Sequence, residues 1–348
     1  MRPEAITFQD MSLVEARSAW TALARRSDNI FSTWEWADSW WRHLVGGEPD
    51  EVQLISVREA PAAIVALHRE RRGGRLLLRL AGHGVADQLG PVCGPEHLPL
   101  ASAALDDLIR GGAILLAERL GDDRDWEAEL HGHVIYQQVA PSIDLVAEGD
   151  WETYLSQRSQ KFRKQVRGRA RRLQDLGVGY RLAKDPDRLS DDFEILLALH
   201  ADQFGPDSGA FRGPREAFHR EFAAEAQRQG WLRLWFAEID GEAIAAWYGF
   251  RYEGVDYAYQ GGRDHRWDRM SVAAAILEHS IRDAFAEGIR EYRLLRGGEP
   301  YKARYATADH RVVTVVAARG LLGRPTLAAM RTLGDSARGR RWLRLEHP

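Results

Sequence analysis

The chain has 348 residues, of which 45% are hydrophobic and 28% charged, with 48 Lys and Arg against 51 Asp and Glu. This composition is that of a globular protein and excludes a disordered, collagen-like or disulfide-rich chain. The net charge of −3 argues against a protein held to nucleic acid by overall charge. The single cysteine, Cys93, excludes an internal disulfide and a multi-cysteine metal site.

The first residues, MRPEAITFQDMSL, lack a basic stretch followed by an apolar one, so we expect no signal peptide. No window approaches the ~18 consecutive apolar residues of a membrane span. We therefore expect a soluble, cytoplasmic protein. At roughly 100–200 residues per domain, the length predicts two domains.

The first 140 residues show the patterns of both helices and strands. The segment STWEWADSWWRH carries four tryptophans, more than one buried helix face holds, and we expect them to pack between the two domains rather than to stack on a sugar. The patterns predict helices over Met11–Ala24, Ser32–His43 and Pro99–Arg110, strands over Glu51–Val57, Ala62–His68, Arg75–Leu80 and Ala113–Leu116, and a loop over Gly82–Pro95.

From Ser142 onward the pattern predicts helices first and then three alternating, aromatic-rich segments. Asp240-Gly241 and Glu253-Gly254 separate those segments, which predicts an antiparallel meander with tight turns. The predicted elements are a strand at Ser142–Val146, helices at Trp151–Gly177, Asp191–Phe204 and Pro214–Gln229, strands at Trp231–Glu238, Ala243–Tyr252 and Val255–Gly261, a helix from its N-cap Ser271 to Gly288, and strands at Glu291–Leu295 and Arg311–Ala317. This order predicts an α+β fold and not a doubly wound nucleotide fold.

The loop Gly261–Met270 (GGRDHRWDRM) leads into the helix that Ser271 begins. Unpaired N–H groups at a helix N-terminus form an anion site, and the three arginines of the loop add positive charge. The residues alone allow either a pyrophosphate site or an exposed polar loop at the start of a surface helix.

The stretch from Trp231 to Tyr305 resembles the second half of FemAB/CelD-type acyltransferases of the GNAT superfamily, with a BioF2-like acetyltransferase domain. The similar pieces are LWFAEIDGEAIAAWYGFRYEGVDYAYQGGRD, a serine-started helix ending in EG, and EYRLLRGGEPYK. Upstream, SQKFRKQVRGRARRLQDLG resembles the family's basic first helix, and LLALHADQFG and NIFSTWEWADSWWRHL extend the similarity toward the N-terminus.

This resemblance implies two tandem GNAT-like domains, each a mixed, mostly antiparallel sheet flanked by helices. We place a degenerate N-terminal domain at residues 1–140, an acyltransferase domain at residues 141–319 and a basic extension at residues 320–348. The implied reaction moves an acyl group from acetyl-CoA or another acyl-CoA to an amine or hydroxyl of a carbohydrate or cell-envelope precursor.

Two alternatives remain open. One is aminoacyl transfer from aminoacyl-tRNA, a partner that the basic helix would serve; the other is a non-catalytic GNAT-like scaffold in polysaccharide biosynthesis. The helix start Ser271-Val272-Ala273 stands where many relatives have S-x-G, and alanine restricts the approach of a phosphate to the backbone. This departure weakens the prediction of acyl-CoA binding more than the prediction of the fold.

On the acyl-CoA interpretation, loop N–H groups with Arg266 or Arg269 hold the pyrophosphate, and a backbone amide near Gln260 polarises the thioester carbonyl. The residues that the resemblance assigns to the co-substrate are Gln260, Gly261, Gly262, Arg266, Arg269, Ser271, Val272 and Ala273.

The motif GEPYK supplies the catalytic candidates Glu299, Tyr301 and Lys302. Glu299 would accept the proton of the nucleophile, Tyr301 would protonate the leaving group, and Lys302 would bind a phosphate or the oxyanion. From the residues alone, an ion pair of Glu299 with Lys302 and a core position for Tyr301 are the alternatives.

The basic run from Arg158 to Arg172 predicts either a solvated helix or a contact with a phosphate-rich substrate. We assign no metal, because His131 and His133 lack further ligands at zinc spacing. With the resemblance added, the substrate-binding candidates are Lys161, Arg163, Lys164, Arg167, His200, Gln203, Tyr257 and Tyr259.

Overall fold

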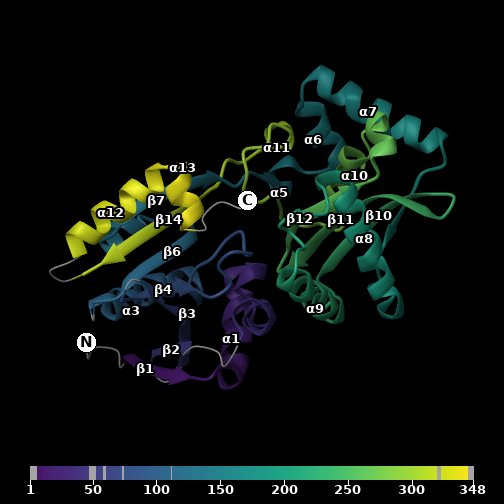
Figure 1. Cartoon of the computed structure of the whole chain (residues 1–348). Coiled ribbons are helices and arrows are strands. Elements are labelled where there is room, and N and C mark those ends of the chain that lie inside the picture. Colours follow the sequence, from purple (N-terminus) through teal and green to yellow (C-terminus); the bar gives the residue numbers. More distant parts are fainter. Residues whose placement is uncertain are drawn as a thin grey trace. The chain divides into compact units, whose positions relative to one another are not determined.

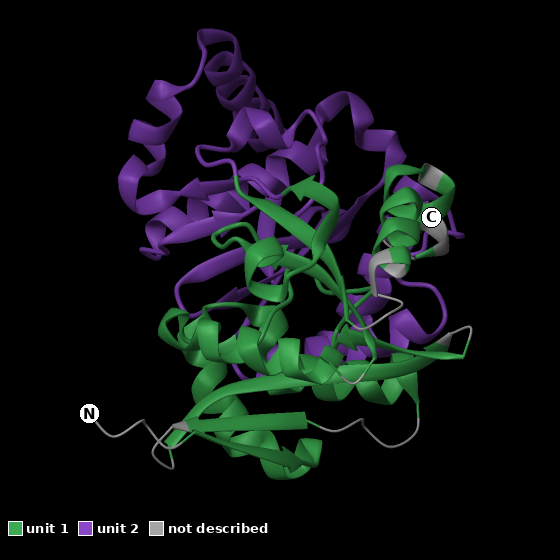
Figure 2. Cartoon of the chain, turned by 90° about the vertical axis from the view of Figure 1, so that its left-hand side faces the viewer, with its two compact units in different colours: residues 1–139, 310–348 green, residues 140–309 purple. Residues whose placement is uncertain are grey.

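The computed structural model describes residues 6–46, 52–57, 60–72, 74–110, 112–319 and 323–343. It divides the chain into two compact units, unit 1 of residues 1–139 and 310–348 and unit 2 of residues 140–309 (Figure 2). The predicted α+β fold class is confirmed. Among the helices of the described ranges, none is long and apolar enough to cross a membrane.

Unit 1 contains an eight-stranded mixed sheet in the order β1-β2-β3-β4-β6-β14-β7, with β5 paired to β3 outside that order (Figure 1). The β4–β6 pair is parallel and the other pairs are antiparallel. The strands are β1 (Ile6–Met11), β2 (Val52–Val57), β3 (Ala60–Arg72), β4 (Arg75–Leu80), β5 (Val92–Cys93), β6 (Ile114–Gly121), β7 (His133–Val139) and β14 (Arg311–Ala318). The helices are α1 (Leu13–Ser27), α2 (Trp34–Trp40), α3 (Leu98–Arg110), α4 (Trp126–Leu130), α12 (Gly323–Asp335) and α13 (Ala337–Trp342).

The predicted tryptophan helix forms as α2 and a π-helical turn at Trp41–Val45. Its four tryptophans are only 0–7% exposed. The indole of Trp34 donates to the carbonyl of Leu13 at 2.8 Å, and the indole of Trp40 donates to the carbonyl of His83 at 3.0 Å. Both contacts lie inside unit 1, so these tryptophans pack in the core of that unit.

The strand predicted at Arg311–Ala317 belongs to unit 1, which corrects the expected second domain of residues 141–319. Strand β14 lies between β6 and β7 and is antiparallel to both. Because seven of its eight residues are buried, it reads as a continuous apolar run that does not reveal which sheet receives it. The segment expected as a basic extension also joins unit 1, where Leu327 and Met330 of α12 are buried.

Unit 2 contains a six-stranded sheet in the order β8-β13-β12-β11-β10-β9. Its strands are β8 (Ser142–Asp144), β9 (Gly179–Leu182), β10 (Leu232–Ile239), β11 (Glu242–Tyr252), β12 (Val255–Arg263) and β13 (Glu291–Arg293). Its helices are α5 (Leu145–Glu148), α6 (Trp151–Gln157), α7 (Gln160–Asp175), α8 (Leu189–Phe204), α9 (Pro214–Arg228), α10 (Val272–Ala286) and α11 (Lys302–Tyr305). The predicted meander forms, and Asp240-Gly241 and Glu253-Gly254 turn it with positive φ angles, as two-residue hairpin loops require.

Helices cover both faces of the unit 2 sheet. Apolar side chains of α6, α7 and α10 pack together with the sheet in two clusters on one face. On the other face, Phe193 of α8 contacts the ring of Tyr248, and Phe222 of α9 contacts the ring of Phe250. The central strands are therefore held between two helical layers, and their ends carry the polar groups described next.

Candidate functional site

Strands β12 and β13 run parallel for three residues and then separate. Val255–Tyr257 lies opposite Glu291–Arg293, after which β12 continues alone on this side. At the same point the pairing of β12 with β11 shifts register, which leaves Tyr259 as an extra, bulged residue. We call the opening between residues 258–263 of β12 and residues 294–296 after β13 the strand wedge. Beyond Tyr257, the backbone of β12 is released from the β13 ladder.

Helix α8 packs directly against the wedge at Gly262. A Cβ atom on Gly262 would lie 2.3 Å from the backbone nitrogen of His200, so this position requires glycine. The carbonyl of Gly261 accepts a hydrogen bond from Nδ1 of His200 at 2.9 Å. Since a carbonyl only accepts, the proton is on Nδ1, and Nε2 accepts from the hydroxyl of Ser208 at 2.8 Å. Burial lowers the pKa of His200, which keeps the ring neutral at pH 7.

The N–H of Gly261 donates to the side-chain Oε1 of Gln260 at 3.2 Å. On its other side, Gly261 lies against the ring of Trp247, where a Cβ atom would come within 2.9 Å of a ring carbon. Gln260 thus covers a backbone donor next to the bulge. Displacing its side chain would leave that N–H to polarise a carbonyl group in the wedge.

Two arginines that sequence reasoning missed lie near the bulge. Arg215, the second residue of α9, interacts electrostatically with Tyr259 and with Arg296, which follows β13. Burial and the charge of Arg296 lower the pKa of Arg215. Two cations brought together in a partly desolvated place favour an anion between them. No local motif marks these two arginines, because the fold brings together a helix start and a strand exit that are distant in sequence.

The hydroxyl of Tyr259 lies 3.4 Å from Nε2 of His219, which is fully buried on α9. Burial is the main cause that lowers the pKa of His219 to about 3, and the positive charge of Arg215 lowers it further. His219 is therefore neutral over the physiological range and belongs to the aromatic wall of the site.

The loop predicted to bind pyrophosphate forms a 3-10 helix, His265–Met270, and the N–H groups of its first three residues are already bonded. The N–H of His265 donates to Asp202 at 2.7 Å, and the N–H of Arg266 donates to Asp264 at 2.8 Å. The bonds from His265 lower the pKa of Asp202, and the side chain and N–H of Arg266 lower the pKa of Asp264, so both carboxyl groups are ionised. Acidic side chains occupy the place where the sequence predicted a phosphate.

Two of the three arginines of this loop also have acidic partners. Arg263 pairs with Asp268 at 2.6 Å, and Arg266 pairs with Asp264 at 2.6 Å. Arg269 is exposed beside them. The predicted role of Arg266 in holding a pyrophosphate would require Asp264 to give up its partner.

Helix α10 starts differently from the prediction. Ser271 has a left-handed backbone (φ 55°) and makes no side-chain capping bond, so it is not the expected side-chain N-cap. Its carbonyl instead accepts the N–H groups of Ala274 and Ala275. Val272 is fully buried, and Ala273 is half-buried.

The motif GEPYK closes a loop around a buried lysine. Lys302 is 6% exposed, and its Nζ donates to the carbonyls of Leu295 (3.3 Å) and Arg296 (2.7 Å). Glu299 lies 3.0 Å away as its ion-pair partner. Leu295 has a φ angle of 60°, a conformation that a leucine adopts only under constraint. These three acceptors match the three protons of the ammonium group, so the geometry favours a positioning role for Lys302.

The other two predicted catalytic residues are accessible. Glu299 is 53% exposed on its side chain, and Gly297 (φ 124°) lets its carboxylate fold back over the loop. Tyr301 is exposed, while desolvation of its hydroxyl and the charge of Glu299 raise its pKa to about 12. Tyr301 therefore keeps its proton at neutral pH.

The predicted basic helix is α7, and its start forms part of an open pocket of about 530 Å³. Ser159 caps α7 by accepting the N–H of Phe162 at 3.2 Å. Arg304 lies over the ring of Phe162 and donates to Gln165 at 2.7 Å. We call this the basic pocket; its lining residues are Gln157, Arg158, Ser159, Lys161, Phe162, Gln165 and Arg304.

The remaining substrate-binding candidates are spread over unit 2. Lys161 lines the basic pocket, Lys164 is exposed on α7, and Arg163 donates to the carbonyl of Ser156 at 2.9 Å. The other candidates are Arg167, which pairs with Glu152 at 3.1 Å, Gln203, which is half-buried on α8, and Tyr257, which is buried and accepts from Arg293 at 3.3 Å. The structure thus separates them into a group on α7, of which Lys161 lines the basic pocket, and a group on α8 and β12.

Residues 160–303 match the model of the family described as "Acetyltransferase (GNAT) domain". No curated protein sequence matches the chain. The family match runs from the start of α7 into α11. It includes the strand wedge and three of the seven residues that line the basic pocket, Lys161, Phe162 and Gln165.

Three solved structures share the fold over most of the chain. FemX has a TM-score of 0.65 at 10% identity and covers 93% of this chain and 100% of its own. The C-terminal domain of a putative lysylphosphatidylglycerol synthetase from Agrobacterium fabrum has a TM-score of 0.62 at 12% identity, over 92% of this chain and 96% of that chain. L-PGS from Bacillus licheniformis has a TM-score of 0.53 at 12% identity, over 80% of this chain and 88% of that chain. The predicted α+β fold with two mixed sheets is thus shared with these structures.

Proposed function

We propose, from the premise that residues 160–303 form a GNAT-superfamily domain, that this acyltransferase takes its acyl group from aminoacyl-tRNA and passes it to an amine or hydroxyl of a cell-envelope precursor. One observation carries the choice of donor. In the predicted pyrophosphate loop, two N–H groups and two of the three arginines are bonded to aspartates, whereas the basic pocket stays open.

The acidic loop disfavours a CoA pyrophosphate for an electrostatic reason. A pyrophosphate at the start of α10 would approach the carboxylates of Asp202, Asp264 and Asp268. Like charges at a few ångströms repel each other, and the N–H groups of His265 and Arg266, which could offset the repulsion, already have acceptors. Binding there would require the loop to rearrange.

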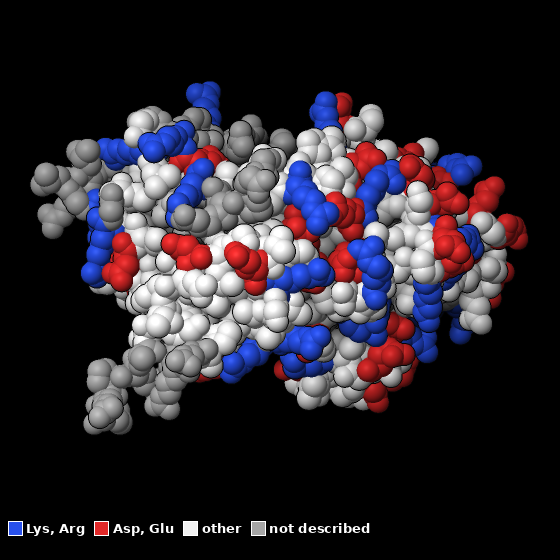
Figure 3. Space-filling view, turned by 90° about the horizontal axis from the view of Figure 1, so that it is seen from below, with Lys and Arg blue, Asp and Glu red and all other residues white. Residues whose placement is uncertain are grey.

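The basic pocket fits a phosphate-rich donor. Arg158, Lys161 and Arg304 line it, and it lies at the N-terminus of the 16-residue helix α7, where helix N–H groups favour anions. Basic and acidic side chains are interspersed over the face in Figure 3. Because the net charge of the chain is −3, a local cluster rather than an overall field would supply the attraction. The name of one similar structure, a putative lysylphosphatidylglycerol synthetase, also supports an aminoacyl donor, since such an enzyme joins an amino acid to a lipid.

In the proposed reaction, the nucleophile of the acceptor attacks the ester carbonyl carbon in the strand wedge. A new C–N or C–O bond forms, the bond to the ribose oxygen breaks, and the N–H of Gly261 stabilises the oxyanion once Gln260 moves. Glu299 takes the proton of the nucleophile, and Tyr301, which holds its proton at neutral pH, protonates the ribose oxygen. Arg215 and Arg296 attract the terminal phosphates of the donor.

Acyl-CoA is the second candidate donor, and the description of the matching family as an acetyltransferase favours it. On that alternative, the residues from Gln260 to Ala273 would hold the co-substrate after the loop opened. The two donors differ in one measurable respect, since tRNA binding uses the basic pocket and CoA binding uses the loop.

Binding of the donor tests the proposal directly. The full-length protein, titrated with an aminoacyl-tRNA at increasing salt, should show an affinity that falls steeply with ionic strength. The double variant Lys161→Ala/Arg304→Ala should bind at least tenfold more weakly and reduce the salt slope by about two. Lys184→Ala, which removes an exposed lysine outside the pocket, is the control and should bind like the parent.

The opposite result would replace the proposal with the acyl-CoA alternative. That result is a rise in melting temperature with millimolar acetyl-CoA, lost in Arg266→Ala, together with tRNA binding that the pocket variant leaves unchanged.

A further inference from the structure

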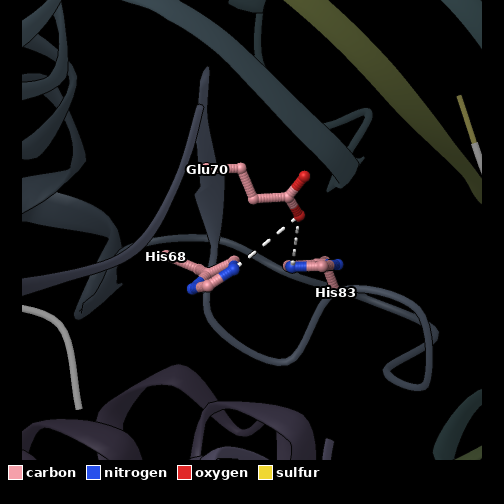
Figure 4. Close-up of side chains that lie close together, drawn as sticks. All are labelled: His68, Glu70 and His83. Atoms are coloured by element: carbon pink, nitrogen blue, oxygen red, sulfur yellow. Dashed lines mark ion pairs between the residues drawn. The ribbon is translucent and has the colours of Figure 1, made fainter. Parts of the chain in front are cut away.

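A cluster of metal-ligating side chains in unit 1 lies outside the candidate site. His68 and Glu70 are two residues apart on β3 and therefore point to the same face of the sheet. His83 follows β4 in a turn between Gly82 (φ 87°) and Gly84 (φ 89°). Figure 4 shows both imidazole rings directed at one carboxylate oxygen of Glu70.

The distances fit a small metal ion. Nε2 of His68 lies 3.7 Å from Oε1 of Glu70, and Nε2 of His83 lies 3.9 Å from the same oxygen. All three ligand atoms lie within 4.8 Å of one another. Ligands on a tetrahedral zinc ion at 2.0–2.1 Å are roughly 3.3 Å apart. The two distances from the imidazoles to Glu70 exceed this value by about half an ångström, and all three ligand atoms lie within 4.8 Å, so side-chain rotations are needed to close the site around an ion.

The surroundings hold the three ligands in place. The ring of Trp40 contacts both imidazoles, at 5.8 Å from His68 and 5.0 Å from His83 between ring centroids. Its indole N–H also donates to the backbone carbonyl of His83 at 3.0 Å, which fixes the turn. The ligands are 13–20% exposed on their side chains, so an ion can reach them from solvent.

The guanidinium of Arg79 lies near the cluster, and Glu118 balances its charge. Arg79 approaches Oε1 of Glu70 at 3.6 Å. It is fully buried, and its Nε and Nη2 donate to Glu118 at 2.9 and 2.6 Å. Glu118 thus neutralises the charge of Arg79, which approaches Glu70 from a buried position.

We propose that His68, Glu70 and His83 bind a divalent transition-metal ion of the zinc class, with a water molecule as the fourth ligand. Two imidazoles and one carboxylate are a donor set that Zn²⁺ prefers, and three protein ligands leave one position for water. The ion would tie β3 to the turn after β4. The expectation from sequence that the chain binds no metal considered His131 and His133 and overlooked this cluster.

The test uses the full-length protein, freed of metal with a chelator and then desalted. Zn²⁺ added and followed by a second desalting should leave one ion per chain by elemental analysis, and Co²⁺ should give the visible absorption of a four-coordinate site. His83→Gln and Glu70→Gln should weaken binding at least tenfold, while far-ultraviolet circular dichroism checks that both variants fold. Zn²⁺ should also raise the melting temperature of the parent and not that of the variants.

His133→Gln is the matched control. His133 also faces a glutamate, Glu127, at 3.8 Å, and it lies in an exposed position of the same unit. Its loss should leave metal binding unchanged. Failure of the parent to retain an ion, or equal retention by parent, His83→Gln and Glu70→Gln, would overturn the proposal.

Discussion

Lys302 shows how a single buried ammonium can define a loop. It joins the carbonyls of Leu295 and Arg296 to the carboxylate of Glu299, and it sits where the chain departs from β13. The left-handed backbone of Leu295 is strained, and the bonds to Lys302 offset that cost. A role in shaping the wedge explains why this buried position carries a charged residue.

Replacement of this residue should therefore lower both stability and turnover. Lys302→Gln leaves buried carbonyls with weaker partners, at a cost of about 1–3 kcal/mol, and lets the loop move. Thermal unfolding should show a melting temperature several degrees lower, with activity reduced at least tenfold. Lys184→Gln, at an exposed position, should change neither. A Lys302→Gln variant with parental stability but no activity would instead favour direct catalysis by the ammonium group.

His219 makes a prediction about pH. Its pKa is about 3 in the folded protein and about 6.5 in the unfolded chain, because burial disfavours the charged ring. Below pH 6.5 the unfolded state binds one proton more than the folded state at His219. The free energy of unfolding should therefore fall by about 1.4 kcal/mol for each unit by which the pH is lowered, through this residue alone. Urea unfolding at pH 7.5 and pH 5 should show a smaller pH dependence for His219→Phe than for the parent.

His265 is the control of opposite sign. His265 is exposed, and its bonds to Asp202 raise its pKa. The charged ring therefore stabilises the folded protein below pH 6.5, and this stabilisation is lost as the pH rises through the pKa of His265 in the folded state. His265→Ala should therefore steepen the loss of stability on acidification or leave it unchanged. An equal pH dependence in the parent and His219→Phe would contradict the assignment to His219.

At this scale the sequence indicated the region of the site better than the roles of its residues. The motif GEPYK and residues Gln260–Gly262 do lie around the strand wedge. The bonds of Lys302 depend on a loop conformation that no short motif specifies. The aspartates that occupy the predicted anion site include Asp202, which reaches it from α8. Arg215 and Arg296 meet through tertiary folding alone.

Among the elements, helix α8 approaches the wedge at Gly262 of β12 so closely that no side chain fits between them. Gly262→Ala would place a methyl group 2.3 Å from the backbone of His200, so the helix must shift. We expect a loss of about 1–3 kcal/mol or more, measured as a lower urea midpoint, and weaker donor binding. Gly179→Ala is the control, because a Cβ atom there meets nothing within 4 Å and its φ angle is not positive. Equal midpoints for the two variants would contradict this packing.

The elements that the sequence predicted share strong local signals. The meander β10–β11–β12 follows from alternating aromatic residues and two turn dipeptides. The missed strands β1 and β7 are largely exposed edge strands, and β9 is a four-residue strand, so none shows a clear buried face. Strand β14 was predicted, but its continuous burial gave no sign of its partners.

At the scale of the whole chain, unit 1 depends on residues that follow unit 2. A chain truncated after Asp309 lacks β14, which pairs with both β6 and β7. We expect limited proteolysis with mass spectrometry to show rapid cleavage within residues 1–139 of this variant and protection of residues 140–309. Protection of residues 1–139 equal to that in the full-length protein would contradict the prediction.

The position of β14 also bears on how the protein is made. Unit 2 is a continuous segment, and all of its strands have left the ribosome once Asp309 has emerged. The sheet of unit 1 begins with residue 6 but cannot close until residue 318 has been translated. Because domains fold as units while the chain is synthesised, the second unit should finish folding before the first. The N-terminal strands must therefore wait, with an incomplete sheet, for nearly the entire period of synthesis.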